Sequence, residues 1–121
     1  ENSSRLVLLS RHRPNAREPN CAWVISPLEL LTSRTWPDNG IEHIDVIFHL
    51  GAFTPKSPDE ANCIDRVYRD NLLGTRALLE SLPSKPEKIV FASTIDVYAR
   101  SAETVLNESS PLWPATLHGA S

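Results

Sequence analysis

Two adjacent hydroxyl side chains mark the place in this sequence that is best suited to chemistry. Ser93 and Thr94 come directly after the short apolar run Ile89–Ala92. We expect that run to be a strand, and open α/β sheets bind their ligands at the carboxyl ends of the strands. A hydroxyl in that place can hydrogen-bond a substrate oxygen and help a proton to move. The alternative is a turn in which the hydroxyls cap backbone N–H groups.

Small and amide side chains provide two further candidate positions. Gly51 and Ala52 end another apolar run, and small residues there would let a flat ligand lie close to the backbone. Tight packing of a strand against a helix would explain the same pair. Asn71 lies beside apolar residues in a predicted helix, where a buried amide needs hydrogen-bond partners. It could brace a strand carbonyl, order a water molecule, or simply be exposed.

Basic residues follow the first apolar run, within Ser10–Arg13. In dinucleotide-binding folds an acidic residue near the end of the second strand binds the ribose hydroxyls, whereas Arg accommodates a 2′-phosphate. Arg11 and Arg13 offer two cations and no acid, and the alternative is a solvated loop. The histidines have no metal-ligand spacing, so no zinc site is predicted; they are His12, His43, His49 and His118. His49 is expected to be a hydrogen-bonded core residue.

Four short apolar runs alternate with helical and polar segments, which predicts an α/β fold. The runs lie at residues 5–10, 21–26, 45–52 and 88–93. Runs of this kind are typical of parallel strands that helices cover on both faces. Apolar residues at helical spacing predict one helix from about Ala61 to Leu82, which Pro83 ends. Gly74 inside this helix is expected to permit close packing against a strand. Residues 27–36 could hold a short helix, residues 114–121 are expected to begin another, and the tryptophans are expected to serve packing.

Composition indicates a soluble globular protein with one domain. The chain has 121 residues, of which 40% are hydrophobic and 22% are charged. A formal net charge of −3 without a dense Lys/Arg cluster argues against nucleic-acid binding. No apolar run approaches the roughly 20 residues that span a bilayer. Cys21 and Cys63 make no disulfide framework, which favours a reduced, cytoplasmic setting. Both ends look cut, as if a larger domain had been trimmed.

Four blocks carry a family resemblance, and they are DVIFHLGA, DNLLGTRALLES, KIVFASTIDVYA and PATLHGAS. Their order and spacing resemble the extended short-chain dehydrogenases/reductases of the NAD-dependent epimerase/dehydratase family. The first three are similar to that family's D-x-V-I-H-L-A-A strand, its N-V-x-G-T-x-x-L-L-E-A helix and its strand ending in S-S/T-x-x-V-Y-G. The fourth is similar to the start of its P-x-x-x-Y-G-x-S-K helix, and RLVLLSR fits its second strand. The resemblance implies a Rossmann-like doubly wound parallel sheet over residues 1–121. That sheet would be incomplete, because the first strand with its Gly-rich loop and the C-terminal substrate portion are absent.

The resemblance assigns a role to each matching position. Thr94 matches the active-site Ser/Thr that hydrogen-bonds the reacting oxygen, and Ser93 lies next to the nicotinamide side. Asn71 matches the helix Asn that braces the sheet and the cofactor region. Gly51 and Ala52 match the small pair beside the dinucleotide. Arg11 falls near the acid that selects NAD, so the cofactor is NAD or NADP, with the missing acid hinting at NADP.

Three departures from the family pattern concern catalysis directly. The Gly-rich loop that cradles the pyrophosphate would precede Glu1. The catalytic Tyr falls on His118, and the Lys that lowers the pKa of that Tyr would follow Ser121. Imidazole titrates near 6.5 and phenol near 10, so His118 could serve as an acid/base. The alternatives are loss of the usual chemistry or a shift in the alignment.

Two function classes follow from the resemblance. The first is an NAD(P)-dependent epimerase, dehydratase or reductase that oxidises a carbon of a nucleotide sugar transiently. The second is a dinucleotide-binding sensor or scaffold with a degenerate active site. The resemblance also implies a possible homodimer through the helix at about Ala61–Leu82.

Overall fold

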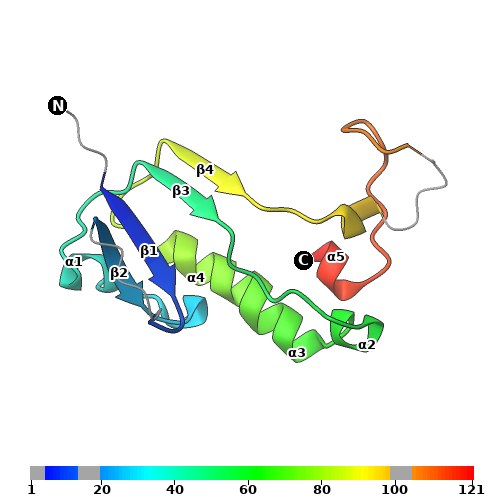
Figure 1. Ribbon diagram of the computed structural model, residues 1–121, viewed down its shortest axis with the longest axis horizontal. Helices are drawn as coiled ribbons and strands as arrows, with labels where there is room; N and C mark the ends of the chain where they lie inside the picture. Colours follow the sequence, from blue (N-terminus) through cyan, green and yellow to red (C-terminus); the bar gives the residue numbers. More distant parts are fainter. Residues whose placement is uncertain (1–4, 14–19, 99–104) are drawn as a thin grey trace.

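The computed structural model describes residues 5–13, 20–98 and 105–121, and it shows two pairs of strands beside a run of helices (Figure 1). The strands are β1 (Leu6–Ser10), β2 (Cys21–Ile25), β3 (Val46–His49) and β4 (Lys88–Phe91). The helical elements are η1 (Leu28–Leu30), α1 (Thr35–Asp38), α2 (Pro58–Ala61), α3 (Ile64–Arg66), η2 (Val67–Leu73), α4 (Gly74–Ser81), η3 (Ile95–Tyr98) and α5 (Leu117–Ala120).

All four predicted strands are present, each shorter than its apolar run, and both pairs are parallel. β1 pairs with β2, with Leu6 opposite Cys21, and β3 pairs with β4, with Val46 opposite Lys88. Within the described residues the two pairs form two separate two-stranded sheets. The arrows of all four strands point toward the same side of the molecule in Figure 1. The prediction of an α/β fold with an incomplete Rossmann-like parallel sheet is confirmed.

The helix predicted from about Ala61 to Leu82 is present from Ile64 to Ser81, but the prediction of its start is wrong. The first turn, α2, ends at Ala61, and Asn62 and Cys63 separate it from α3. Asn62 Nδ2 donates a hydrogen bond to the carbonyl of Pro58 at 3.3 Å, which is the kind of local side-chain bond that competes with a helix. From Ile64 onward the helix is continuous in space, but its middle part, η2, is a π-helix.

The π-helical stretch η2 carries two neighbouring buried polar residues. Asp70 and Asn71 have exposed fractions of only 3% and 9%. Two neighbours can share the inward stripe of a helix. Turns of the π type are frequent at functional sites, so this pair marks η2 as a candidate.

The core lies between the strands and one layer of helices. It consists of Val24, Leu31, Trp36, Ile41 and Leu78. The indole N–H of Trp36 donates to Ser81 Oγ at 2.9 Å, so the ring is buried without an unpaired donor. Packing was expected of all three tryptophans, but Trp113 is 58% exposed.

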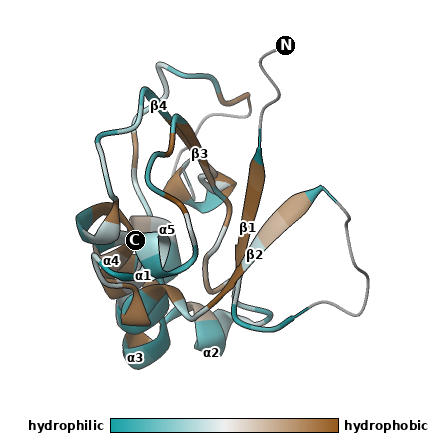
Figure 2. Cartoon of the chain, turned by 90° about the vertical axis from the view of Figure 1, so that its left-hand side faces the viewer, coloured by the Kyte–Doolittle hydropathy of each residue, from teal (hydrophilic) through white to brown (hydrophobic). Residues whose placement is uncertain are grey.

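The expectation that helices cover both faces of the strands is also wrong for the described residues. Every residue of β4 is exposed, and Phe48 on β3 is 67% exposed. Figure 2 shows the apolar strands with the helices gathered to one side. No helix in the described residues is both long and apolar enough to cross a membrane.

Gly74 does permit a close approach, but its neighbour is not a strand. A Cβ on Gly74 would lie 3.1 Å from Leu28 Cβ. Leu28 begins the 3₁₀ turn η1, which is what forms in place of the short helix expected within residues 27–36. The absence of a side chain at Gly74 therefore brings α4 against η1.

Candidate functional site

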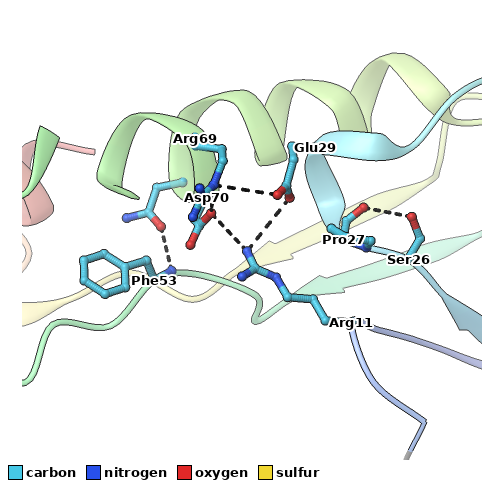
Figure 3. Close-up of polar contacts among 8 residues, drawn as sticks. Arg11, Ser26, Pro27, Glu29, Phe53, Arg69 and Asp70 are labelled. Carbon is cyan, nitrogen blue, oxygen red and sulfur yellow. Dashed lines mark hydrogen bonds and ion pairs between the residues drawn. The ribbon is translucent and has the colours of Figure 1, made fainter. Parts of the chain in front are cut away.

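A cluster of four charged side chains lies at the carboxyl end of β1 (Figure 3). Arg11 Nη2 lies 3.1 Å from Asp70 Oδ1 and 3.9 Å from Glu29 Oε2. Arg69 Nε donates to the same Asp70 oxygen at 2.8 Å and lies 3.8 Å from Glu29 Oε1. The cluster joins the end of β1 to η1 and to the π-helix η2.

Asp70 is the buried centre of this cluster. Burial by itself raises the pKa of a carboxyl group, but hydrogen bonds from Arg69 and Arg11 and the charges of both guanidiniums outweigh it and lower the pKa of Asp70. The same contacts with Asp70 raise the pKa of Arg69. Asp70 therefore stays ionised at neutral pH. Arg11, predicted to meet the cofactor, is held by two carboxylates and is 44% exposed.

A single hollow connects three of the predicted cofactor residues. It has a volume of about 1330 Å³ and is lined by Arg11, Gly51 and Ala52 together with residues of β1 and β3. Gly51 and Ala52 are exposed, so the backbone after β3 is open to a ligand there. The open backbone and the adjacent guanidinium fit the sugar and phosphate groups of a dinucleotide. Residues 14–19, which follow Arg11 and Arg13, lie outside the described residues.

The side chain of Asn71 is buried and has two hydrogen-bond partners. Its Oδ1 accepts a hydrogen bond from the backbone N–H of Phe53 at 2.7 Å, and its Nδ2 donates to Ser121 Oγ at 2.9 Å. Ser121 Oγ in turn donates to the carbonyl of His118 at 2.9 Å. The buried amide thus links the loop after β3 to the turn that carries His118.

Ser93 and Thr94 come shortly after β4, the strand that pairs with β3. Ser93 is exposed, and Thr94 is half-buried. Thr94 Oγ1 accepts a hydrogen bond from the backbone N–H of Asp96 at 3.3 Å, at the start of η3. The hydroxyl therefore caps a turn, as the structural alternative predicted, and its own proton is still available to a substrate oxygen. Neither residue lines the hollow beside Arg11.

His118 lies in the helical turn α5, which packs against η3. Thr116 caps this turn by accepting a hydrogen bond from Gly119 N–H at 3.0 Å. A Cβ on Gly119 would lie 2.7 Å from the carbonyl oxygen of Asp96, so only glycine permits this approach. The Nδ1 atom of His118 is buried and has no hydrogen-bond partner in the described residues. No hydrogen bond in that part of the chain joins His118 to Thr94.

The structure thus gathers the predicted residues into two groups. Arg11, Gly51 and Ala52 line the hollow between β1 and β3. Thr94 directly precedes η3, and His118 lies in α5, which packs against η3. Asn71 connects the two groups through Phe53 and Ser121. No group of three or more potential metal ligands occurs in the described residues, and no zinc site was predicted.

Sequence reasoning missed Asp70 and Glu29. Asp70 has the sequence context of an ordinary helix carboxylate, and nothing in the periodicity indicates that it is buried. Glu29 lies in a segment that was expected to hold a short helix, yet its Oε2 atom is buried without a hydrogen-bond partner in the described residues. The only available signal was the pair of cations after β1, to which an acidic partner could bind.

Comparisons with known proteins agree with this arrangement. The family model described as the NAD dependent epimerase/dehydratase family matches residues 7–121. No match is found among the curated proteins. The chain is similar to the structure of a short-chain dehydrogenase/reductase superfamily protein from Agrobacterium tumefaciens with bound NAD. The two are 28% identical, and the TM-score is 0.65 over 94% of this chain.

Two further structures share the fold. A mutated uronate dehydrogenase has a TM-score of 0.70 at 24% identity, and a putative epimerase from Burkholderia cenocepacia has 0.64 at 22% identity. Each match covers 94% of this chain, but this chain spans only 33% to 39% of the three structures. Because the family model matches nearly every residue, the chain belongs to the NAD-dependent epimerase/dehydratase family.

Proposed function

We propose that this chain forms the middle of the NAD(P)-binding domain of an enzyme that transfers hydride at a sugar carbon. The observation that carries the proposal is the shared hollow beside β1 and β3, where Arg11 and the open Gly51–Ala52 backbone meet. Ligands of open α/β sheets bind at this end of the strands. Family membership supports the choice of a nicotinamide dinucleotide as the ligand.

The residues of the chain divide the work as follows. Gly51 and Ala52 would lie along the dinucleotide, and Arg11 would face its adenosine ribose, where a 2′-phosphate distinguishes NADP from NAD. Ser93 would border the nicotinamide, which when bound supplies the hydride acceptor and donor. Thr94 would donate a hydrogen bond to the substrate oxygen at which charge changes. His118 would exchange the hydroxyl proton, since imidazole is the commonest general acid and base among side chains.

The substrate, the setting and the assembly belong to the same proposal. A nucleotide sugar is the substrate class that we propose, and a cytoplasmic setting agrees with the two free cysteines, Cys21 and Cys63. A homodimer through the helices α3, η2 and α4 is proposed because large apolar side chains on them are exposed; these are Ile64, Tyr68, Leu72 and Leu79.

A second candidate function is dinucleotide binding without turnover. The observation that favours it is that Nδ1 of His118 is buried without a hydrogen-bond partner in the described residues. By the family resemblance, His118 stands where the catalytic Tyr would be. A protein that had lost the acid/base could still bind the cofactor and act as a sensor or scaffold.

The experiment that separates the two candidates combines binding and turnover in the complete protein. Fluorescence titration with NADH and NADPH measures cofactor affinity, and reduction or epimerisation of nucleotide sugars measures activity. We expect Thr94→Val to lower kcat about 100-fold, as loss of a positioned proton-transfer group does, with little change in cofactor affinity. Thr32→Val, at an exposed threonine outside the site, is the matched control.

Two results would decide against the enzyme. The first is cofactor binding without turnover of any nucleotide sugar, and the second is turnover that Thr94→Val leaves unchanged. Absence of cofactor binding would remove both candidates.

A further inference from the structure

A histidine outside the candidate functional site lies between a serine and an aspartate. His43 Nδ1 lies 2.7 Å from Ser84 Oγ, and His43 Nε2 lies 2.9 Å from Asp45 Oδ1. His43 and Asp45 belong to the segment before β3, whereas Ser84 belongs to the segment between α4 and β4, 41 residues after His43 in the chain. Only the fold brings this hydroxyl, imidazole and carboxylate together, and we call the three residues the Ser84 cluster.

Backbone hydrogen bonds hold the two segments of the Ser84 cluster against each other. The carbonyl of Asp45 accepts hydrogen bonds from the backbone N–H groups of Glu87 and Lys88 at 2.8 and 3.2 Å. Lys88 begins β4, which pairs with β3 from Val46 onward. The strand ladder, and not only the side chains, therefore brings the two segments together.

The Ser84 cluster lies at the opposite end of the strands from the candidate functional site. It precedes the amino ends of β3 and β4, whereas Arg11 and Gly51 follow the carboxyl ends of β1 and β3. The arrows of β3 and β4 in Figure 1 lead away from the cluster and toward the end at which the candidate site lies. His43 and Asp45 border one end of the hollow, but Ser84 does not line it. The hydroxyl of the cluster is therefore separate from the dinucleotide site.

The directions of the two hydrogen bonds follow from the chemistry of the three groups. An ionised carboxylate only accepts hydrogen bonds, so the contact with Asp45 requires a proton on His43 Nε2. In the neutral imidazole Nδ1 then has the lone pair, and it accepts the hydrogen bond that the Ser84 hydroxyl donates. The carboxylate thus selects the tautomer in which the ring can take the proton of the serine. An orienting acid, a base and a nucleophile in this relation form a catalytic triad, which is recognised by geometry and role and not by sequence position.

The exposure of the Ser84 cluster decides which substrate it can take. The side chains of His43 and Asp45 are 59% and 68% exposed. A small molecule can therefore reach Ser84 without a cavity, but water weakens the electrostatic stabilisation of a developing oxyanion. An ester with a good leaving group needs the least stabilisation, because that group departs without a proton. The cluster therefore fits small aryl esters.

We propose that the Ser84 cluster is an acyl-transfer site that hydrolyses small aryl esters, with Ser84 as the nucleophile, His43 as the base and Asp45 as the residue that orients His43. Ser84 Oγ bonds to the acyl carbon and the aryl oxide leaves, while the serine proton passes to His43 Nδ1 and on to water. A water molecule then attacks the acyl-serine, and His43 transfers a proton of that water to the departing Ser84 oxygen. The products are a carboxylic acid, the aryl oxide and the proton released in the first step. This inference does not depend on cofactor binding.

Covalent labelling of the complete protein tests whether Ser84 is activated. The probe is diisopropyl fluorophosphate, whose phosphorus bonds to an activated serine oxygen as fluoride leaves, and mass spectrometry of peptides locates the label. We expect Ser84 to react about 100-fold faster than Ser33, which is the lower end of what a positioned base contributes. Ser33 is exposed, and its hydroxyl has no histidine partner within the part of the chain that the structure describes.

Hydrolysis of p-nitrophenyl acetate tests turnover at the same serine. Ser84→Ala should remove the release of p-nitrophenolate that depends on the cluster, and Ser33→Ala is the matched control that should leave it unchanged. His43→Gln should lower the labelling rate of Ser84 about 100-fold, because the base is lost. Asp45→Asn should lower it about tenfold or more, because an amide no longer selects the reactive tautomer.

Unfolding separates the chemistry of the Ser84 cluster from a purely structural role. Circular dichroism and urea midpoints show which variants fold, and the wild-type protein is also labelled in urea. We expect unfolded Ser84 to react no faster than Ser33, because only the fold brings His43 beside it. This comparison tests the proposal even with variants that fail to fold.

Four results would overturn the proposal. They are labelling of Ser84 no faster than that of Ser33, equal labelling of Ser84 in the folded and the unfolded protein, a folded His43→Gln variant with the wild-type labelling rate, and ester hydrolysis that Ser84→Ala leaves unchanged. Any of them would show that the three side chains only join the segment before β3 to the segment before β4.

Discussion

The charge of Asp70 is predicted to stabilise the fold, and Asp70→Asn removes that charge with almost no change in shape. The carboxylate is 3% exposed and receives Arg69 Nε at 2.8 Å and Arg11 Nη2 at 3.1 Å. Breaking a buried ion pair by removing one partner costs about 3–5 kcal/mol. Both guanidiniums are about half exposed, so solvent screens them, and we expect the loss to be about 2 kcal/mol.

The assay is urea unfolding of the wild-type and Asp70→Asn chains at several pH values. The pKa of Asp70 is lowered in the folded state, so the unfolded chain binds the proton more readily. The stabilisation is therefore fully present above the ordinary Asp pKa of about 3.9 and is lost as the pH falls through the lowered value. The difference between the two chains should be constant from pH 7 to about pH 5 and shrink below about pH 4.

An exposed ion pair on the same helical run provides the matched control. Arg76 Nε lies 2.8 Å from Glu80 Oε1, but the two side chains are 70% and 62% exposed. We expect Glu80→Gln to leave the unfolding midpoint unchanged, because exposed pairs gain little. If Asp70→Asn costs no more than Glu80→Gln, or if its effect does not decline in acid, the charge of Asp70 does not stabilise the fold and the reasoning is refuted.

Three further predictions concern single contacts. Gly119→Ala places a Cβ 2.7 Å from the Asp96 carbonyl oxygen and should lower the free energy of unfolding by about 1–3 kcal/mol in urea titrations, whereas an unchanged midpoint would show that α5 does not pack on η3. Asn71→Ala leaves the buried N–H of Phe53 without its acceptor and should cost about 1–3 kcal/mol, with faster amide exchange at Phe53 as the specific sign. Burial lowers the pKa of His49 below 6.5, so the stability that neutral His49 contributes is present above pH 6.5 and is lost as the pH falls through the lowered pKa. His49→Gln should remove this part of the pH dependence of the free energy of unfolding. An identical pH profile in the wild-type and variant chains would contradict the prediction.

The local sequence predicted the strands, the main helix and the family. It did not predict where the helix is interrupted or which strand faces the helices leave exposed. The short, mainly apolar runs predicted β1 to β4, because such segments bounded by polar turns are typical of buried strands. Periodicity placed a helix before β4 but missed its interruption at Asn62, where a side-chain hydrogen bond to the Pro58 carbonyl competes with the helix. It also missed the π turn at Asp70, because apolar spacing does not distinguish a π turn from an α turn.

The sequence by itself named candidates from their places at the ends of apolar runs or among apolar neighbours; these are Thr94, Ser93, Gly51, Ala52, Arg11 and Asn71. The family resemblance added His118. The tertiary structure alone decided their partners. It set Arg11 against Asp70 and Glu29, joined Asn71 to Phe53 and Ser121, and left a hollow between β1 and β3. Such contacts join residues far apart in the chain, so they depend on how strands and helices pack and not on any local pattern of residues.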